Sequence, residues 1–173
     1  IRYDGAGGLV SYSSVASFSS GAGSEESFYS GDFSSETAND IAFSSNGSVM
    51  YWCNDSGLYS KTLSTPYDLS TLGYFSTTYN NASFGVGQTG LYISDDGTDV
   101  ITYNPTSGSV IKLKLSSAYN LSSASVVQSA SVALLSTTSL VMSDDGTKMI
   151  YIDSSNNIVY KTLSTAWNLS TLS

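Results

Sequence analysis

Two pairs of adjacent carboxylates are the clearest candidates for chemistry in this sequence. They are Asp95-Asp96 and Asp144-Asp145, and two neighbouring carboxylates can divide general acid and general base work between them. Each pair precedes a Gly-Thr dipeptide, however, and an earlier copy of the same segment has Ser45-Asn46 instead. Because Asp and Asn both favour tight turns, a turn-forming role explains all three copies. We therefore expect no catalytic residues and a protein that is not an enzyme.

Metal and cofactor sites are not indicated either. The sequence has no His and one Cys, Cys53, which excludes His-based triads, His metal sites and an intrachain disulfide. A calcium loop places acidic residues at alternate positions, a spacing that neither carboxylate pair has. Cys53 lies in an apolar run, where a lone thiol ordinarily serves as a small buried apolar residue. We expect no cofactor and no bound metal.

An aromatic residue that recurs in a ten-residue motif is the best candidate for ligand contact. A row of such rings, if exposed, could stack on carbohydrate; the three residues are Tyr67, Tyr119 and Trp167. Packing between strands is the alternative, because each ring is followed by Asp or Asn and Leu-Ser, and this Asp or Asn side chain can bond its own loop. Five residues also match the N-glycosylation pattern, which matters only in a host that glycosylates: Asn46, Asn54, Asn81, Asn120 and Asn168.

Composition narrows the class of protein. The 173 residues include 6 basic and 14 acidic side chains, a net charge of −8, whereas 40% are hydrophobic and 12% aromatic. That apolar content is ample for a packed core, so disorder is excluded as the main state. The negative charge repels phosphate backbones, so we expect no nucleic-acid partner. No apolar run reaches the roughly 18 residues of a spanning helix, so we expect no membrane insertion.

A repeat of about 50 residues organises the chain. Its first landmark is a short apolar run that ends in Asn-Gly or Asp-Gly, at 41–48, 91–98 and 140–147. The glycines of these segments, Gly47, Gly97 and Gly146, recur at intervals of 50 and 49 residues. Its second landmark is the ten-residue motif, at 63–72, 115–124 and 163–172. Three matches of both landmarks in the same order indicate one structural unit used repeatedly.

Each unit predicts four short antiparallel strands. The first strand precedes the Asn-Gly or Asp-Gly turn, a strong hairpin signal. The second strands are predicted at 49–53, 100–103 and 149–152, and the third at 58–63, 110–115 and 158–163. The fourth follow the ten-residue motif, at 73–78 and 125–129, and by register around 27–30. Four-stranded units of this length predict an all-β protein built from β-propeller blades.

The repeat also predicts the domain organisation. Residues 1–173 form a single repeat domain, with a partial unit at 1–23 and further units at 24–72, 73–124 and 125–173. This amounts to about three and a half blades, fewer than the four to eight with which propellers close. We therefore expect that the segment does not close a ring alone. The missing strands would come from the rest of a longer chain or from other copies.

The repeat resembles a known class of propeller. The succession of Ser-Asp-Asp-Gly-Thr, strand, polar turn, strand and Leu-Ser-Thr-Ala-Trp-Asn-Leu-Ser-Thr is similar to TolB/YVTN-like β-propeller repeats. Such repeats recur in bacteriophage structural proteins and in prokaryotic surface proteins. The repeat implies no single function, but the resemblance to phage proteins favours a non-catalytic, extracellular virion component, a tail, fibre or decoration protein. The alternative is a cell-surface or filament protein that uses its propeller for adhesion or lattice contacts. Expected partners are protein subunits, the rest of its own chain, or cell-surface glycan.

Overall fold

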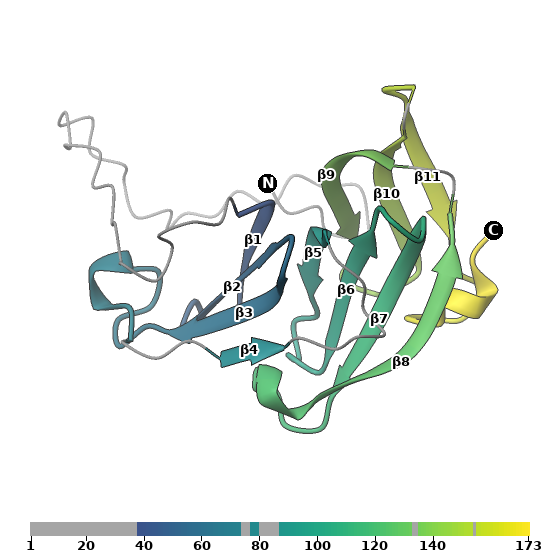
Figure 1. Ribbon diagram of the computed structural model, residues 1–173. Coiled ribbons are helices and arrows are strands. Elements are labelled where there is room, and N and C mark those ends of the chain that lie inside the picture. The colour runs from purple at the N-terminus through teal and green to yellow at the C-terminus, as the bar shows by residue number, and fades with distance from the viewer. Residues whose placement is uncertain (1–37, 74–76, 80–86, 133–134, 154) are drawn as a thin grey trace, which may run out of the picture.

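The computed structural model describes residues 38–73, 77–79, 87–132, 135–153 and 155–173, which fold into antiparallel β-sheets (Figure 1). The first sheet contains β1 (Asp40–Phe43), β2 (Val49–Asn54), β3 (Gly57–Thr62) and β4 (Thr77–Tyr79). The second contains β5 (Thr89–Ile93), β6 (Asp99–Asn104), β7 (Ser109–Leu115) and β8 (Ala124–Ser131). The third contains β9 (Leu135–Met142), β10 (Lys148–Asp153) and β11 (Ile158–Thr162) within the described residues.

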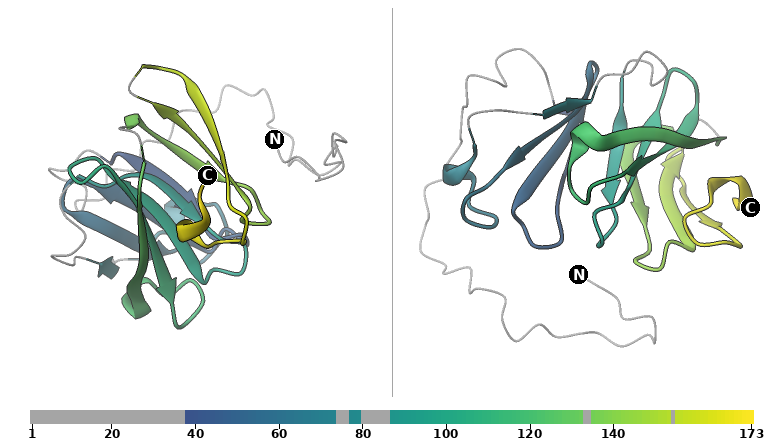
Figure 2. Two further views of the ribbon diagram at one scale, coloured as in Figure 1. Left: turned by 90° about the vertical axis from the view of Figure 1, so that its right-hand side faces the viewer. Right: turned by 90° about the horizontal axis from the view of Figure 1, so that it is seen from below.

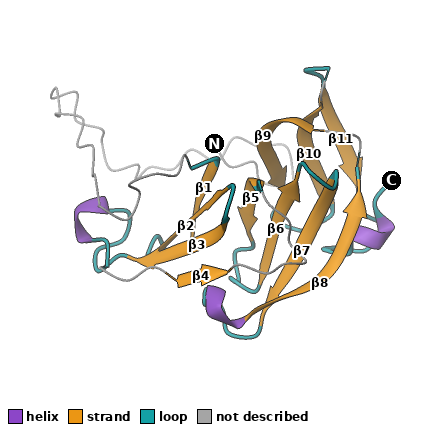
Figure 3. Cartoon of the chain, viewed as in Figure 1, coloured by secondary structure: helices purple, strands orange, loops and turns teal. Residues whose placement is uncertain are grey.

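The three sheets lie side by side, and the first strand of each sheet is next to the first strand of the neighbouring sheet. Within each sheet the strands follow one another in chain order, and neighbours are antiparallel (Figure 3). β1 contacts β5 and β5 contacts β9, while the later strands of each sheet lie further out (Figure 2). This is the arrangement of successive propeller blades. The predicted fold class is therefore confirmed, and the three sheets are called the first, second and third blade below.

A hydrogen-bonded turn ends the first strand of each blade. In the second blade the Asp96 carboxylate accepts from Ser94 Oγ at 2.6 Å and from the Thr98 amide at 3.0 Å. Gly97 between them has a φ of +68°, a left-handed conformation that glycine adopts without steric cost. The same bonds recur around Asn46 and Asp145. The Asn-Gly or Asp-Gly signature thus specifies the hairpin between the first and second strands.

The ten-residue motif forms a loop that ends in one turn of 3-10 helix. These turns are η2 (Leu69–Thr71), η4 (Leu121–Ser123) and η5 (Leu169–Thr171). The preceding Asp or Asn caps each turn by accepting from the backbone amide two residues later, at 3.0 Å for Asp68 and 3.1 Å for Asn120 and Asn168. The predicted bond between this side chain and its own loop is confirmed.

Apolar side chains fill the two junctions between blades. The first junction includes Tyr51, Cys53 and Leu58 of the first blade, packed with residues such as Leu91 and Leu113 of the second. Cys53 is fully buried, and burial raises the pKa of its thiol to about 12. This matches the expected role of a small apolar residue. The second junction is built in the same way, from residues that include Ile101, Tyr103, Val110, Leu140 and Met149.

The predicted fourth strands are found with adjusted bounds. The strand predicted at 73–78 corresponds to β4, and the strand predicted at 125–129 lies inside β8. The partial unit at 1–23 and the strand predicted around 27–30 lie outside the described residues. Two sheets therefore have all four strands of a blade, and the third shows three strands within the described part of the chain.

Candidate functional site

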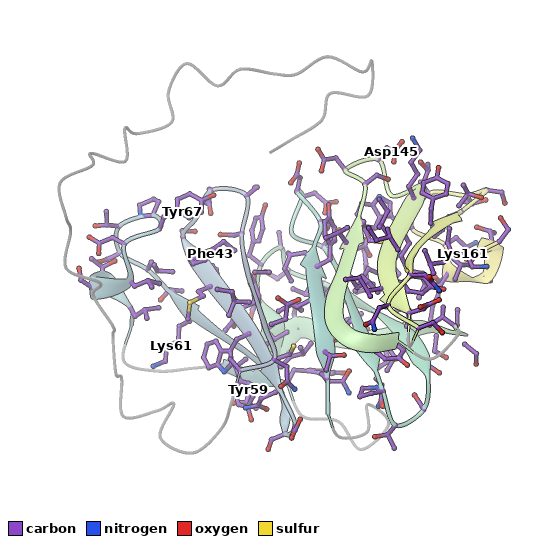
Figure 4. All side chains as sticks on the ribbon, turned by 90° about the horizontal axis from the view of Figure 1, so that it is seen from above. Phe43, Tyr59, Lys61, Tyr67, Asp145 and Lys161 are labelled. Carbon is purple, nitrogen blue, oxygen red and sulfur yellow. The ribbon has the colours of Figure 1, made fainter. Side chains whose placement is uncertain are left out.

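A pocket of about 270 Å³ lies at the turn end of the blades, where β1 and β5 meet. Its polar lining includes Ser45, Tyr67 and the carboxylates Asp95 and Asp144, and the lining residues that belong to the described part of the chain include no Lys or Arg. Phe43 and Tyr67 lie next to each other on the first blade, with ring centroids 5.4 Å apart (Figure 4). The pocket therefore offers aromatic rings, hydroxyls and negative charge, a set that suits neutral polar or cationic groups and repels anions.

The two members of each carboxylate pair have different surroundings. Asp96 and Asp145, the second members, are bonded inside their own turns. These hydrogen bonds, above all the one from the turn serine, lower their pKa values, to about 2 for Asp145. The turn-forming interpretation is confirmed for both. Asp95 and Asp144, the first members, line the pocket instead. The sequence repeat did not distinguish the first members from the second, although the signal was present: a side chain bonded inside a turn points away from its neighbour in the pair.

Each aromatic residue of the motif covers the turn glycine of its own blade. Tyr67, Tyr119 and Trp167 all have a φ near +60°, and their amides donate to the carbonyls of the three turn glycines at 2.8 to 3.0 Å. A methyl group placed on Gly97 would lie 2.5 Å from ring carbons of Tyr119. The Tyr119 hydroxyl bonds the Asp95 carbonyl and lies 2.7 Å from Ser45 Oγ of the first blade. These contacts hold the loop of the ten-residue motif against the turn between the first and second strands. Their contact with glycan stays a prediction, and Tyr67 is the most exposed at 59%.

The ten-residue motifs of the second and third blades also bond to the blade before them. At the first junction the Tyr51 hydroxyl donates to the backbone carbonyl of Tyr119 at 2.6 Å. At the second junction Lys112 Nζ donates to the backbone carbonyl of Trp167 at 2.8 Å. The acceptor is the same motif position in both cases, the aromatic residue in the left-handed conformation. Each junction therefore contains one long-range hydrogen bond to this carbonyl.

The two donors lie on different strands of their blades. Tyr51 of β2 is paired with Ser60 of β3, whereas Ile101 of β6 is paired with Lys112 of β7. The hydrogen-bond donor is therefore on the second strand in the first blade and on the third strand in the second blade, within the same cross-strand pair. An alignment of single positions places Tyr51 opposite Ile101 and does not show that the donor is kept. An alignment of cross-strand pairs shows that each pair contains one long polar side chain.

A buried ion pair holds Lys112 in place. Asp99 Oδ1 lies 3.2 Å from Lys112 Nζ and 3.3 Å from Lys114 Nζ. The side chains of Asp99 and Lys112 are 8% and 11% exposed. Because an unpaired buried charge is costly, removing either side chain would destabilise the other. Lys114, which is more exposed, also donates to Thr98 Oγ1 at 2.7 Å. The network ties β6 and β7 to the second junction.

Asp40 provides another polar contact at the first junction. Its Oδ2 accepts from the backbone amide of Leu91 at 2.8 Å. A register shift between Thr89 and Leu91, with Gly90 at a φ of +63°, makes this amide available to the neighbouring blade. Burial raises the pKa of the Asp40 carboxyl, although the hydrogen bonds from the Leu91 and Ile41 amides act in the opposite direction. This carboxylate is therefore structural.

The glycosylation sequons differ in accessibility. Asn46 and Asn120 are exposed and Asn168 is half-buried. Asn54 is 3% exposed, and its Oδ1 accepts from the amides of Ser56 and Gly57 at 2.8 and 3.1 Å. A glycan has no access to that side chain in the folded chain. Asn81 lies outside the described residues.

Two general features of the described residues bear on cofactors and membranes. They contain no group of three or more Cys, Asp or Glu side chains placed to hold a metal ion. No helix in the described ranges has the length and apolar character to cross a bilayer.

Comparison with known proteins shows the fold. No protein-family model and no curated protein matches the sequence. A solved structure from Bacteroides fragilis, provisionally named a 6-phosphogluconolactonase, is similar with a TM-score of 0.54 at 14% identity, over 78% of this chain and 36% of that one. A protein of the same provisional name from Bacteroides uniformis gives 0.53 at 13%, over 77% and 37%. A functionally unknown protein from Desulfotomaculum acetoxidans gives 0.50 at 15%, over 79% and 40%. The chain thus spans at most two fifths of each protein and shares with them a propeller-like all-β fold.

Proposed function

We propose that this chain is a non-catalytic part of an extracellular protein, a virion tail, fibre or decoration component whose propeller gives a rigid surface for assembly or host attachment. The observation that carries the proposal is that the polar side chains form hydrogen bonds within the scaffold. Asp96 and Asp145 are bonded inside turns, Asp40 and Lys112 inside blade junctions. These groups stabilise the scaffold, and none of them is placed to act on a substrate.

The pocket supports a role in attachment. Aromatic rings beside hydroxyls and carboxylates suit a neutral polar ligand, because rings stack on apolar sugar faces while the oxygens bond hydroxyl groups. Tyr67 contributes both an exposed ring and part of the lining. A cell-surface glycan is the ligand class that these features favour.

The names of two similar structures raise the possibility of lactone hydrolysis. A phosphorylated lactone is an anion, and proteins hold phosphate mainly through Arg, Lys and backbone amides. Among the described residues, the pocket presents Asp95 and Asp144 and no basic side chain. The charge of the pocket therefore argues against this activity for the chain.

The choice between a virion and a cell surface depends on the resemblance of the repeat. TolB/YVTN-like repeats occur in both settings, and the similarity to bacteriophage structural proteins favours the virion. The alternative is an extracellular cell-surface or filament protein that uses the blades for adhesion or lattice contacts. Other protein subunits are the expected partners in both cases.

Immunoelectron microscopy tests the proposal. Antibodies raised against the chain are applied to virus particles and to cells from a culture that expresses the protein, with pre-immune serum as control. Label on particle tails or fibres is expected. Label on the cell envelope would replace the virion assignment with the alternative, and label confined to the cytoplasm would contradict both. Hydrolysis of 6-phosphogluconolactone faster than the uncatalysed rate would contradict the non-catalytic assignment.

A further inference from the structure

A second pocket, of about 260 Å³, lies at the first junction, between β3 of the first blade and the ten-residue motif of the second. We call it the junction pocket. Its lining includes Val49, Ser60 and Thr62 of the first blade and Tyr119, Asn120 and Leu121 of the second. None of its described lining residues also lines the pocket at the turn end. The proposed attachment function does not use the junction pocket.

At the second junction the corresponding space is occupied by side chains of the second blade. The strand pairing aligns three lining residues of the junction pocket with the ion-pair network: Val49 with Asp99, Ser60 with Lys112, and Thr62 with Lys114. In that network Lys112 reaches across the junction to the Trp167 carbonyl. The first blade has shorter side chains at these positions, and the space is open.

Gln128 of β8 occupies the rest of this space at the second junction. It is paired with Lys112 across β7 and β8, and its carboxamide makes two hydrogen bonds to the ten-residue motif of the third blade. Nε2 donates to Asn168 Oδ1 at 3.0 Å, and Oε1 accepts from the Leu169 amide at 2.9 Å. A primary carboxamide is therefore the group that this motif binds at the second junction.

The first junction has the same two backbone and side-chain groups but no carboxamide bonded to them. Asn120 and Leu121, the counterparts of Asn168 and Leu169, line the junction pocket. Within the described part of the chain the Leu121 amide has no acceptor. Asn120 is exposed, whereas Asn168 beneath Gln128 is half-buried.

The fourth strand accounts for this difference between the junctions. β4 contacts η4 as β8 contacts η5, so the two fourth strands have the same position relative to the next blade (Figure 1). The residue of β4 that is paired with Ser60, as Gln128 is paired with Lys112, is Thr77. Threonine has no carboxamide, so the first blade does not supply the group that the motif of the second blade is built to bind.

A buried hydroxyl also indicates a polar occupant. Ser60 is 6% exposed and lines the junction pocket, and among the described residues its Oγ has no hydrogen-bond partner. Burying a hydroxyl without a partner is unfavourable, and a serine hydroxyl can both donate and accept. A polar group bound in the pocket would satisfy it.

We propose that the junction pocket binds a primary carboxamide, whose oxygen accepts from the Leu121 amide and whose nitrogen donates to Asn120 Oδ1. The chain itself makes this arrangement with Gln128 at the second junction. Complete ligand sites enclose about 300 to 1,000 Å³. The smaller junction pocket suits a single end group, the carboxamide of free glutamine or of a Gln side chain on a partner protein. The proposal is independent of the attachment function.

Titration of the ¹⁵N-labelled full chain with propionamide, followed through its amide NMR resonances, tests the proposal. Propionamide reproduces the side chain of glutamine. The Leu121 resonance should shift saturably, with a Kd of about 1 to 100 mM for so small a ligand. The Leu169 resonance is the internal control and should not shift, because Gln128 already bonds that amide. N,N-dimethylpropionamide has no N–H donor and should bind about 2- to 12-fold more weakly.

A variant opens the equivalent site at the second junction. Gln128→Thr gives β8 the residue type that β4 has, so the Leu169 resonance should then respond to propionamide as the Leu121 resonance does. Val127→Thr is the matched control, because Val127 is the adjacent residue of β8 and is 50% exposed. It should leave the Leu169 resonance unresponsive. Circular dichroism verifies that both variants fold.

Three outcomes would overturn the proposal. They are a Leu121 resonance that does not shift with propionamide up to about 200 mM, equal affinity for the dimethylated compound, and a Leu169 resonance that stays unresponsive in Gln128→Thr. The source of the carboxamide is assigned by comparing free glutamine with an Ala-Gln-Ala peptide capped by acetyl and N-methylamide groups. Tighter binding of the peptide assigns the group to a partner protein, and tighter binding of glutamine assigns it to a small molecule.

Discussion

The turn glycines and the motif aromatics should be energetically coupled, and Gly97 with Tyr119 allows the sharpest test. In Gly97→Ala the new methyl group would lie 2.5 Å from Cδ1 and Cε1 of Tyr119. The backbone at this residue has a φ of +68°, which costs a residue with a side chain about 1 to 2 kcal/mol. Crowding of a packed site adds about 1 to 3 kcal/mol. Gly97→Ala should therefore lower the free energy of unfolding by about 2 to 5 kcal/mol.

Gly87→Ala is the matched control for backbone strain. Gly87 has a φ of +81°, and a methyl group there would lie 3.5 Å from Pro105 and 3.8 Å from Asp55, which are ordinary contacts. This variant should lose only about 1 to 2 kcal/mol. Both variants are measured by urea unfolding followed by tryptophan fluorescence and circular dichroism, with the m-value checked for constancy.

A double-mutant cycle isolates the contact with the ring. In the Tyr119→Ala background the added methyl group of Gly97→Ala has no ring to displace. The cost of Gly97→Ala should therefore fall by about 1 to 3 kcal/mol, leaving the backbone contribution alone. Equal costs in both backgrounds, or equal costs for Gly97→Ala and Gly87→Ala, would refute the assignment of Tyr119 as a cover for the turn.

The remaining predictions concern acid stability, a junction and the thiol. The pKa of Asp145 is about 2 when folded and near 3.9 when unfolded, so its stabilisation is complete above about pH 4 and disappears as the pH falls toward 2. Asp145→Asn, which imitates Asn46, should flatten the pH dependence of the unfolding free energy in this window; an unchanged slope would contradict it. Tyr51→Phe leaves the Tyr119 carbonyl without its donor and should cost about 0.5 to 1.5 kcal/mol in urea unfolding. Cys53 should react with a thiol reagent only as fast as the chain unfolds, and rapid labelling in native buffer would show otherwise.

The repeat predicted the architecture because each landmark specifies a local structure. An Asn-Gly or Asp-Gly dipeptide closes a hairpin through backbone conformation and its own side chain, so it functions in any blade. The Asp or Asn of the ten-residue motif caps a turn two residues away. Both interactions depend on a few consecutive residues. They are therefore visible in a sequence without knowledge of the neighbouring blade.

The junctions and the pocket could not be predicted in the same way. The bond between Lys112 and Trp167 joins residues 55 positions apart, and that between Tyr51 and Tyr119 joins residues 68 apart. Nothing local distinguishes Lys112 from the other lysines of the sequence. The pocket likewise depends on how β1 and β5 approach each other. The positions of Asp95 and Asp144 on its lining follow from that packing and not from their own turn.

The comparison of the blades separates positions fixed by the scaffold from positions available for binding. The second residue of each turn pair, Asn46, Asp96 or Asp145, keeps one hydrogen-bonding role in all three blades. The first residue does not have that role and varies from Ser in the first blade to Asp in the other two, Asp95 and Asp144. The pocket is consequently asymmetric, neutral beside β1 and negative beside the second and third blades. A ligand bound there would be oriented by this difference in charge, so a repeated scaffold need not bind a symmetric partner.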